Sequence, residues 1–443
     1  MANNLTEPRT LQGTLELLPP DQILFNRMYD TIRETYESFG FLPLDTPVLE
    51  LSNVLLAKAG GETEKQIYRF TKGDTDLAMR FDLTVPLARY VAQHKNDLVF
   101  PFKRYQMGKV YRGERPQKGR FREFYQCDID IIGAEELDLM YDAEMPAVIY
   151  NVFTKLNFGD FVIRLNNRKV LNGFFANLGF ADRIGDILRT IDKLEKIGAE
   201  KVMAELNEFG VDGSSAEKIF AFISISGSNA EVISALKKVD CDNETFKCGV
   251  DEIEKVITYA YMYGIPEKNI AIDLTIARGL DYYTGTVYET KMVDYPTLGS
   301  VCSGGRYDNL TGYYTEDRLP GIGISIGLTR LFSQLRSENI LSGESGSLTD
   351  VLFIPMDKNN IEFVLKSAAE IRAAGFNVDV YCLDKGMKPK MKFANRSQVP
   401  YVALVGDSEA ECGKIMLKNM TTGEQELLTV AEAIEKITFS EAD

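Results

Sequence analysis

Residues 278–285 are the part of this chain whose residue types most directly suggest chemistry. They read Arg-Gly-Leu-Asp-Tyr-Tyr-Thr-Gly, which sets a permanent cation, a carboxylate and two phenols close together. Arginine binds phosphate or carboxylate in a bidentate manner, and tyrosine offers a flat face with a polar tip that can select a planar ring. The segment predicts a pocket for an anionic, phosphate-bearing substrate with an aromatic or heterocyclic part. A β-hairpin with glycines at its turns and tyrosines packed across its strands explains the same residues equally well.

Other segments combine polar side chains with glycines in a pattern that a single site would explain. Alternation along an extended strand places Gln126, Asp128 and Asp130 on one face. Glycines at 321 and 323 let a backbone or a ligand approach closely, and Arg330 at the following helix is placed to close over a phosphate. We predict one site from residues 80–84, 111–130, 278–285 with 303–308, and 321–330.

The elements that must position this site follow from periodicity and turn residues. An apolar stripe predicts a helix from Asp21 to Gly40, and residues 84–94 predict another. Residues 42–49, with two prolines, predict an edge strand or an extended segment, and residues 77–81 a further strand. Strands near 104–112 and 121–132 form a long hairpin around a basic loop. Further strands are expected at 271–274, 285–291 and around Val301, and residues 321–327 lead into a helix.

Changes in pattern along the chain predict an α/β protein of several domains. The stretch from about 170 to 263 is helical in period and poor in strand signals, so it reads as an inserted module. Serine and glycine enrich residues 342–347, and the chain then alternates β-α-β-α-β as a small α/β domain. We divide the chain into residues 1–169 and 266–337 as two parts of a core, 170–265 as the helical insertion, 338–349 as a linker and 350–443 as the last domain.

Composition limits the chemistry that the chain can perform. It has 443 residues, of which 45% are apolar and 26% charged, and no apolar run long enough to cross a membrane. We therefore expect a cytoplasmic protein. The single histidine, His94, lies at a polar helix end, which argues against a histidine-based triad or a multi-histidine metal site. Six cysteines without a Cys-x-x-Cys pair are expected to be reduced and mainly buried.

Two basic clusters stand out against a net charge of −15. Residues 103–122 carry eight basic side chains, with Glu114 as the single acid, and aromatic residues alternate with them. Residues 385–396 carry five basic side chains and no acid. Because local charge governs contact with a polyanion, both clusters remain candidates for nucleic-acid binding despite the acidic total.

The order of these motifs resembles that of the class II aminoacyl-tRNA synthetases, and residues 278–285 and 304–308 resemble the histidyl-tRNA synthetase family in particular. The resemblance covers nearly the whole chain. It implies a catalytic core of antiparallel sheet flanked by helices, with a helical insertion and a C-terminal α/β anticodon-binding domain. Thr329 departs from the acidic residue that the class often has before its arginine, which weakens that motif but leaves Arg330 in place.

The resemblance implies ATP-dependent activation of histidine to histidyl-adenylate, followed by transfer to the 3′ end of tRNA(His). This chemistry joins two anions and needs no general base, so positive charge and positioning supply most of the catalysis. Arg112 and Arg278 are the expected catalytic residues at the α-phosphate. Mg²⁺ is expected mainly on the ATP phosphates rather than in a protein site. The implied ATP-binding residues are Arg112, Glu114, Arg120, Phe124 and Arg330.

The same resemblance assigns residues to the amino acid and to tRNA. Asp82, Thr84 and Gln126 would accept from the ammonium of L-histidine, while Asp130, Tyr283 and Tyr307 would recognise its imidazole. A homodimer through the first helix and strand is also implied. The implied tRNA-binding residues are Arg115 and Lys118 at the acceptor end, and Lys388, Lys390, Lys392 and Arg396 at the anticodon stem.

Two alternatives compete with this interpretation. One is a non-enzymatic paralogue that serves as a regulatory subunit of ATP phosphoribosyltransferase, a family that lacks the anticodon domain and often loses catalytic positions. Arg112, Gln126, Arg278 and Arg330 are all present here, and residues 350–443 are retained, which disfavours that reading. The other is a class II synthetase for a different amino acid, disfavoured by residues 278–285 and 304–308.

Overall fold

The computed structural model describes residues 5–57, 62–115, 119–191, 193–276, 283–341 and 347–440. The chain divides into two compact units, one formed by Met1–Glu16 and Arg27–Ser342, the other by Leu17–Asn26 and Gly343–Asp443. In the described part of the chain, no helix is long and apolar enough to cross a membrane.

The first unit is built on an eight-stranded sheet in the order β1-β5-β6-β11-β10-β9-β7-β8. All pairs between β5 and β7 are antiparallel, and only the two outermost pairs, β1 with β5 and β7 with β8, are parallel. The strands are β1 Leu42–Pro43, β5 Phe102–Tyr111, β6 Glu123–Ile132, β7 Phe161–Asn167, β8 Ile270–Ile272, β9 Thr286–Met292, β10 Ser300–Tyr307 and β11 Gly321–Ile326.

Strand register brings polar side chains from distant parts of the chain into two rows on one face. Asp130 of β6 lies opposite Arg104 of β5 and Gly323 of β11, and Gly323 lies opposite Gly305 of β10. The neighbouring row contains Gln106, Asp128, Ser325 and Ser303. Because side chains alternate between the faces of a strand, every second residue of these strands points to the same side as Asp128 and Asp130.

Helices cover and complete this sheet. Helix α5 (Met140–Leu156) packs on β7, β10 and β11, and Tyr36 of α1 (Pro19–Ser38) donates a hydrogen bond to the carbonyl of Cys127. Helix α4 (Thr84–His94) begins two residues after Asp82, which lies in the connection before it, and α13 (Leu328–Ser337) begins two residues after the last residue of β11. Short helices α2 (Ser52–Leu56) and α3 (Glu62–Gln66) accompany a small sheet, β2 (Leu49–Leu51), β4 (Thr75–Met79) and β3 (Arg69–Lys72).

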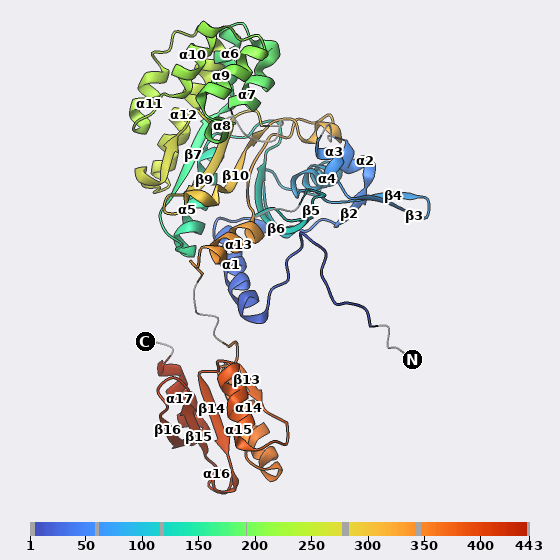
Figure 1. The fold of residues 1–443 in the computed structure, drawn as a ribbon, viewed down its shortest axis with the longest axis vertical. Helices are drawn as coiled ribbons and strands as arrows, with labels where there is room; N and C mark the ends of the chain where they lie inside the picture. The colour runs from blue at the N-terminus through green and yellow to red at the C-terminus, as the bar shows by residue number, and fades with distance from the viewer. Residues whose placement is uncertain are drawn as a thin grey trace. The chain divides into compact units, whose positions relative to one another are not determined.

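The insertion is helical, as its period predicts, and its helices gather beyond the β7 side of the sheet (Figure 1). Helices α6 and α12 approach closely because two glycines leave room: a Cβ atom on Gly173 would lie 2.4 Å from the Phe246 nitrogen, and one on Gly249 2.7 Å from the Val170 nitrogen. The helices are α6 Arg168–Asn177, α7 Ile184–Ile191, α8 Leu194–Ile197, α9 Ala199–Glu208, α10 Gly213–Ile223, α11 Asn229–Leu236 and α12 Glu244–Met262.

The second unit contains a five-stranded sheet in the order β13-β12-β14-β15-β16. Strands β12, β13 and β14 are parallel and joined through helices, as the alternating pattern predicts, while β15 and β16 add an antiparallel edge that the pattern did not indicate. The elements are β12 Val351–Pro355, α14 Ile361–Ala373, β13 Val378–Val380, α15 Met387–Arg396, β14 Tyr401–Val405, α16 Asp407–Glu411, β15 Ile415–Asn419, β16 Gln425–Leu428 and α17 Val430–Ser440.

The segment 42–49, predicted as an edge strand or an extended segment, is not one continuous strand. The segment divides between β1 in the large sheet and β2 in the small one. Arg80 holds the connection, because its guanidinium donates hydrogen bonds to the Thr46 carbonyl at 2.5 Å and to the Asp45 carboxylate at 3.1 Å. The chain therefore crosses from one sheet to the other between these strands.

Candidate active site

A cavity of about 450 Å³ opens on the polar face of the large sheet and collects nearly all the predicted substrate residues. Arg278 and Tyr282 lie outside the described residues, so the structure does not place the first part of the opening motif. The predicted residues that line the cavity are Asp82, Thr84, Arg112, Glu114, Arg120, Phe124, Gln126, Asp130, Tyr283, Tyr307 and Arg330.

Asp130 is held by two buried partners at what we call the acidic end of the cavity, formed by Asp82, Asp128 and Asp130. The Tyr307 hydroxyl donates to Asp130 Oδ1 at 2.7 Å, and Arg104 Nη2 lies 2.6 Å from Asp130 Oδ2. Burial raises the pKa of Asp130 to about 6, although Arg104 and the Tyr307 hydroxyl both favour the ionised form. Arg104 is fully buried, and its Nε and Nη1 atoms have no hydrogen-bond partner among the described residues.

Asp128 lies beside this pair and is also buried. The Ser325 hydroxyl donates to Asp128 Oδ1 at 2.5 Å, and Gln126 Nε2 in turn donates to Ser325 Oγ at 2.7 Å. Burial raises the pKa of Asp128 to about 7, with further upward contributions from Asp130 and Asp82, against the opposing effects of Arg104 and Ser325. Asp82 completes the group at the start of α4, where its carboxylate accepts from the Val85 amide at 3.0 Å.

Glycines in β10 and β11 make room for these side chains. A Cβ atom on Gly323 would lie 2.1 Å from Asp130 Oδ1, and one on Gly321 would lie 2.4 Å from the Tyr307 ring. Gly305 leaves similar room for Tyr283, 2.9 Å from its Cδ1 atom. The sequence predicted close approach at 321 and 323, and the groups that approach are the neighbouring Tyr307 and Asp130 side chains.

The other end of the cavity is cationic. The Arg112 guanidinium lies 4.4 Å from the centre of the Phe81 ring and 5.1 Å from that of Phe124, and its Nε donates to the Phe81 carbonyl at 3.3 Å. Rings on two sides restrict the rotamers of Arg112 and favour its charge at a defined place. Arg80 donates from Nε to the Lys109 carbonyl at 2.8 Å, and Gly108 leaves space for its guanidinium.

Three more predicted residues lie at this cationic end. Arg120 Nη1 lies 3.1 Å from Glu114 Oε2, so two predicted ATP-binding residues form an ion pair. Arg330 donates from Nη2 to the Leu298 carbonyl at 3.4 Å, beside Gly119 and Gly299. Thr329, the departure from the class pattern, accepts a hydrogen bond from the Tyr125 amide at 2.8 Å and thereby ties α13 to β6.

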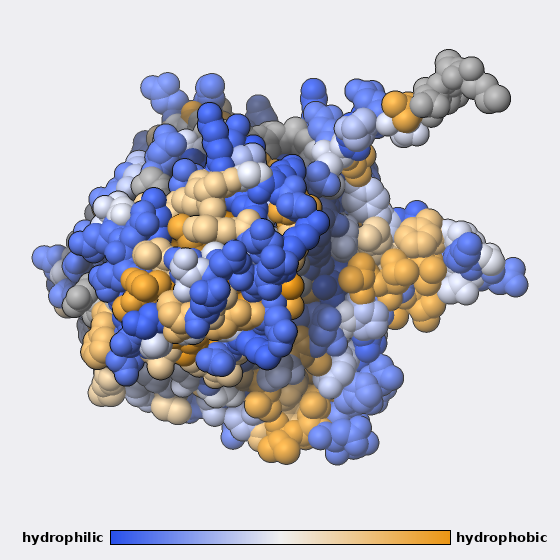
Figure 2. All heavy atoms as spheres, turned by 90° about the horizontal axis from the view of Figure 1, so that it is seen from below, coloured by the Kyte–Doolittle hydropathy of each residue, from blue (hydrophilic) through white to orange (hydrophobic). Residues whose placement is uncertain are grey.

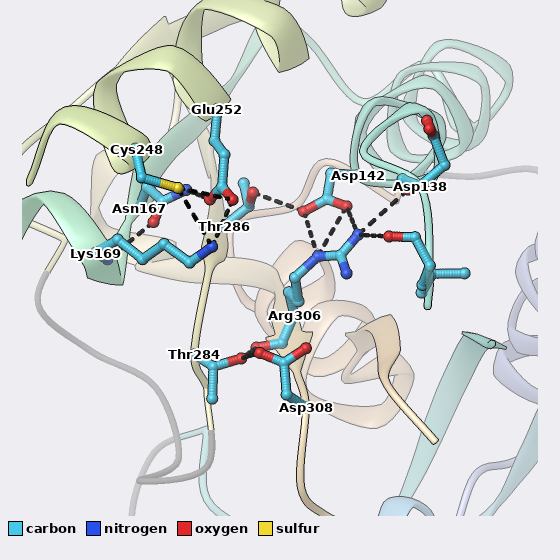
Figure 3. A network of polar contacts seen from close by, with 11 residues as sticks. Asp138, Asp142, Asn167, Lys169, Cys248, Glu252, Thr284, Thr286, Arg306 and Asp308 are labelled. Carbon is cyan, nitrogen blue, oxygen red and sulfur yellow. Dashed lines mark hydrogen bonds and ion pairs between the residues drawn. The ribbon is translucent and has the colours of Figure 1, made fainter. Parts of the chain in front are cut away.

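Arg306, next to Tyr307 in the Gly-Gly-Arg-Tyr-Asp motif, points away from the cavity. Its Nε lies 3.1 Å from both carboxylate oxygens of Asp142 on α5, and the Thr286 hydroxyl donates to the same carboxylate at 2.7 Å (Figure 3). The Tyr288 hydroxyl donates to the Asp142 carbonyl. Strand β10 is thus anchored to α5 through one residue while the next residue faces the site.

The comparisons with known proteins agree with this geometry. Residues 13–331 match the family model for histidyl-tRNA synthetase, and residues 350–439 match the model of an anticodon-binding domain. The chain belongs to the histidyl-tRNA synthetase family. The predictions of a class II synthetase fold and of a histidine–tRNA ligase activity are thereby confirmed.

Individual relatives of this synthetase chain span its full length. A histidine–tRNA ligase of Clostridium tetani is 56% identical over 99% of both chains, and one of Stenotrophomonas maltophilia is 47% identical over 95% of both. The crystal structure of histidyl-tRNA synthetase from Nostoc sp. PCC 7120 superposes with a TM-score of 0.91 at 42% identity, covering 98% of this chain and 100% of that one. A Bacillus halodurans protein is described as an ATP phosphoribosyltransferase regulatory subunit/histidyl-tRNA synthetase. It superposes with a TM-score of 0.74 at 20% identity, covering 87% of this chain and 96% of that one. At this identity the similarity shows a shared fold only.

The predicted tRNA-binding residues have different environments. Arg115, Lys388, Lys392 and Arg396 are exposed, whereas Lys118 lies outside the described residues. Lys390 is a correction: only 4% of it is exposed, and its ammonium donates to the Pro355 carbonyl at 2.5 Å. A lysine buried in this way supports the fold of its domain and is not available to a nucleic acid.

Some expectations about single residues also need correction. His94 ends α4 as predicted, with its ring tilted against that of Tyr90, and does not line the cavity. The six cysteines are free, but only Cys127, Cys241 and Cys302 are buried, so the expectation that they are mainly buried holds for half of them. Sequence reasoning assigned no role in substrate binding to Asp128 or to two partners of the acidic end, Arg104 and Ser325. Strand alternation had already placed Asp128 on the same face as Asp130.

Proposed function

We propose that this cavity activates histidine by bringing its carboxylate to the α-phosphate of ATP. The observation that carries the proposal is the division of one cavity into a buried acidic end and a cationic end. The acidic end holds three carboxylates, and among the described residues the buried Arg104 pairs with one of them, Asp130. The cationic end holds Arg112, Arg120 and Arg330. A substrate that is cationic at one end and meets a polyphosphate at the other complements this arrangement.

At the acidic end, the ammonium of histidine would lie among Asp82, Thr84 and Gln126. The imidazole would lie between Tyr283 and the Asp130–Tyr307 pair, where each ring nitrogen meets a polar partner. A ring without these nitrogens would leave buried polar groups unpaired, at a cost of about 1–3 kcal/mol each. Selection against other amino acids would follow from this loss.

At the cationic end, Arg112 would hold the α-phosphate and Arg278 would stabilise the same centre from the opposite side. Arg120 and Arg330 would bind the outer phosphates, Phe124 would stack on adenine, and Glu114 would orient Arg120. In the described part of the chain, no group of three or more histidine, cysteine or acidic side chains is arranged to hold a metal ion. Mg²⁺ would therefore enter with the phosphates of ATP, whose charge it would reduce.

Transfer of histidine needs tRNA(His), whose acceptor end would meet Arg115 and Lys118. Lys388, Lys392 and Arg396 of α15 would contact the anticodon stem, where unpaired bases are open to reading. Lys390 is not part of this proposed surface. The cytoplasm, where tRNA is charged, would be the location of the enzyme.

We also propose that two copies of the chain form a homodimer. Leu49, Leu51 and Phe70 are exposed on the small sheet, and Leu51 and Phe70 both lie opposite Leu77 in the ladder, so they share a face. Figure 2 shows this apolar face on a projecting arm with a polar tip. Sedimentation of the full chain is expected to give twice its mass of 49.7 kDa. A monomer at the same concentration would contradict the dimer.

Exchange of labelled pyrophosphate into ATP, measured with each amino acid in turn, tests the activation proposal. Histidine alone is expected to support exchange. The variant Arg278→Ala is expected to lose exchange while keeping its melting temperature and its affinity for tRNA. Exchange with another amino acid would refute the histidine assignment, and full exchange by Arg278→Ala would refute the role given to that arginine.

A further inference from the structure

Gln126, Ser325 and Asp128 form a hydrogen-bond chain at the acidic end of the cavity. Ser325 lies directly opposite Asp128 in the β6–β11 ladder, and Gln126 lies two residues before Asp128 on the same face. Gln126 Nε2 is 2.7 Å from Ser325 Oγ, and Ser325 Oγ is 2.5 Å from Asp128 Oδ1. All three side chains line the cavity.

The chemistry of the three groups gives this chain a direction. Ser325 donates its single proton to Asp128, which is the direction that an ionised carboxylate requires because it can only accept. The ammonium of a bound substrate would favour this ionised form of Asp128. The hydroxyl oxygen then has only lone pairs to offer, and Gln126 must meet it with its NH₂ group. The carbonyl end of the Gln126 amide is thereby turned away from Ser325.

In the described part of the chain, the carbonyl oxygen of Gln126 lacks the hydrogen-bond partner that a buried acceptor normally has. Gln126 Oε1 is buried and has no hydrogen-bond partner among the described residues. Buried acceptors are rarely left unpaired in folded proteins. An oriented, unpaired acceptor on the wall of a cavity indicates a hydrogen-bond donor supplied by a ligand.

We propose that Asp128 and Ser325 are positioning residues that fix the amide of Gln126 with its carbonyl oxygen towards the cavity, where it accepts a hydrogen bond from the α-ammonium of histidine. This inference rests on the proposed activation of histidine. The opposite amide orientation would present NH₂ to the ammonium and repel it. A glutamine without this chain can adopt both orientations, since the two ends of its amide have nearly the same shape.

The variant Ser325→Ala breaks the chain, and two histidine analogues distinguish its effect from a general disturbance of the cavity. Histidinol retains the ammonium and the imidazole, whereas imidazole propionate retains the imidazole and the carboxylate but has no ammonium. The KM for histidine and the inhibition constant of histidinol are expected to rise by at least about twofold, because only part of the Gln126 population then presents its carbonyl oxygen to the ammonium. The inhibition constant of imidazole propionate and the KM for ATP should stay unchanged. Equal weakening of both analogues, or no change in either, would overturn the proposal.

Two further variants serve as controls. Ser325→Thr keeps the hydroxyl and is expected to restore histidinol binding, which a loss of packing alone would not explain. Asp128→Asn removes the group that sets the direction and should raise the KM for histidine, while the double variant with Ser325→Ala should be no worse than Ser325→Ala alone. Additive losses would mean independent roles and would refute the chain. These two variants also decide the question if Ser325→Ala does not fold.

The same assays separate this inference from the proposed function. The unmodified chain could support pyrophosphate exchange with histidine as the amino acid while Ser325→Ala keeps the same KM for histidine. That result would refute only the role given to Ser325 and Asp128. If the unmodified chain shows no exchange with histidine, the proposed function falls and this inference falls with it.

Discussion

Asp128 and Asp130 determine the electrostatics of the acidic end, and their burial has a cost for the empty enzyme. Both carboxyl groups are buried, with Asp82 nearby, and among the described residues the buried Arg104 is the cation that acts on both. Burial disfavours the charged form, so each group binds its proton more tightly in the folded chain than in the unfolded one. The buried carboxylates thus favour a cationic substrate, but they lower the free energy of unfolding of the chain when no substrate is bound.

This cost predicts that Asp128→Asn stabilises the ligand-free protein in a pH-dependent way. The folded pKa of about 7 exceeds the ordinary value of 3.8, so the folded state binds more protons between these values and loses stability as pH rises. The penalty is absent below pH 3.8, grows up to pH 7 and is constant above it. Thermal melts without substrate should give the variant a higher melting temperature at pH 8 than the unmodified chain, by about 2 to 4 °C for each kcal/mol of relief.

The pH dependence is the decisive part of that experiment. The gap between the two melting temperatures should narrow at pH 5, because Asp128 is then largely protonated in the folded chain. A gap that is the same at pH 5 and pH 8 would mean that the substitution acts through packing and not through charge.

Gly323 offers a second test at the scale of single residues. An added Cβ atom would lie 2.1 Å from Asp130 Oδ1 and 2.6 Å from the Ile129 carbonyl, so Gly323→Ala must displace the carboxylate or the strand. We expect a loss of about 1–3 kcal/mol of stability, with a higher KM for histidine. Gly327→Ala is the matched control, since its Cβ would come no closer than 3.8 Å to Arg330 Cβ. Equal denaturation midpoints for the two variants would contradict the steric argument.

At the scale of elements, the long hairpin and the glycine-containing strand could be predicted from the sequence. The residues that face each other across neighbouring strands could not. Strands β5 and β6 fall within two residues of the predicted positions, because alternation and a glycine-proline loop are local signals. The Arg104–Asp130 pair depends on the register of two strands, which no local pattern encodes. Four cations of the basic cluster at 103–122 pair with acids, and the charge count did not indicate these pairs: Lys103 with Glu144, Arg104 with Asp130, Lys109 with Glu123 and Arg120 with Glu114.

Helix α15 shows a signal that the charge count overlooked. Lys388, Lys392 and Arg396 follow each other at intervals of four and share the exposed face, whereas Lys390 is half a turn away and buried. Counting basic residues treated all four alike. Helical periodicity would have separated them.

This arrangement predicts opposite behaviour for neighbouring lysines of α15. The triple variant Lys388→Ala, Lys392→Ala and Arg396→Ala should bind tRNA more weakly and reduce the slope of log affinity against log salt by up to about 3. Its pyrophosphate exchange and its melting temperature should not change. Lys390→Ala should lower the melting temperature of the domain instead, because it removes a buried hydrogen bond to Pro355. Filter binding over a salt series measures the slope, and an unchanged slope in the triple variant would refute the assignment.

At the scale of the whole molecule, the chain consists of two compact units with separate cores. The second unit has its own buried cluster around Phe353, Val364 and Ala403, and the cavity lies entirely in the first. A ligand stabilises only the unit whose folded form binds it.

Calorimetry of the full chain should therefore show two unfolding transitions. Histidine and ATP together are expected to raise the midpoint of one transition and leave the other in place. The Arg278→Ala variant should show the same two transitions with a smaller shift. A single transition that moves as a whole on addition of the substrates would show that the two units unfold as one.

Gly321 and Gly323 also limit how this site could change its amino acid in evolution. Any other residue at these positions places a Cβ atom against the Tyr307 ring or the Asp130 carboxylate, at 2.4 and 2.1 Å. A substitution in β11 at either position must therefore be accompanied by a change in β10 or β6. A variant with only one of these changes would lose affinity for histidine before it gained affinity for another amino acid. Selection would remove such intermediates. The two glycines therefore constrain the descendants of this enzyme to keep histidine as their amino-acid substrate.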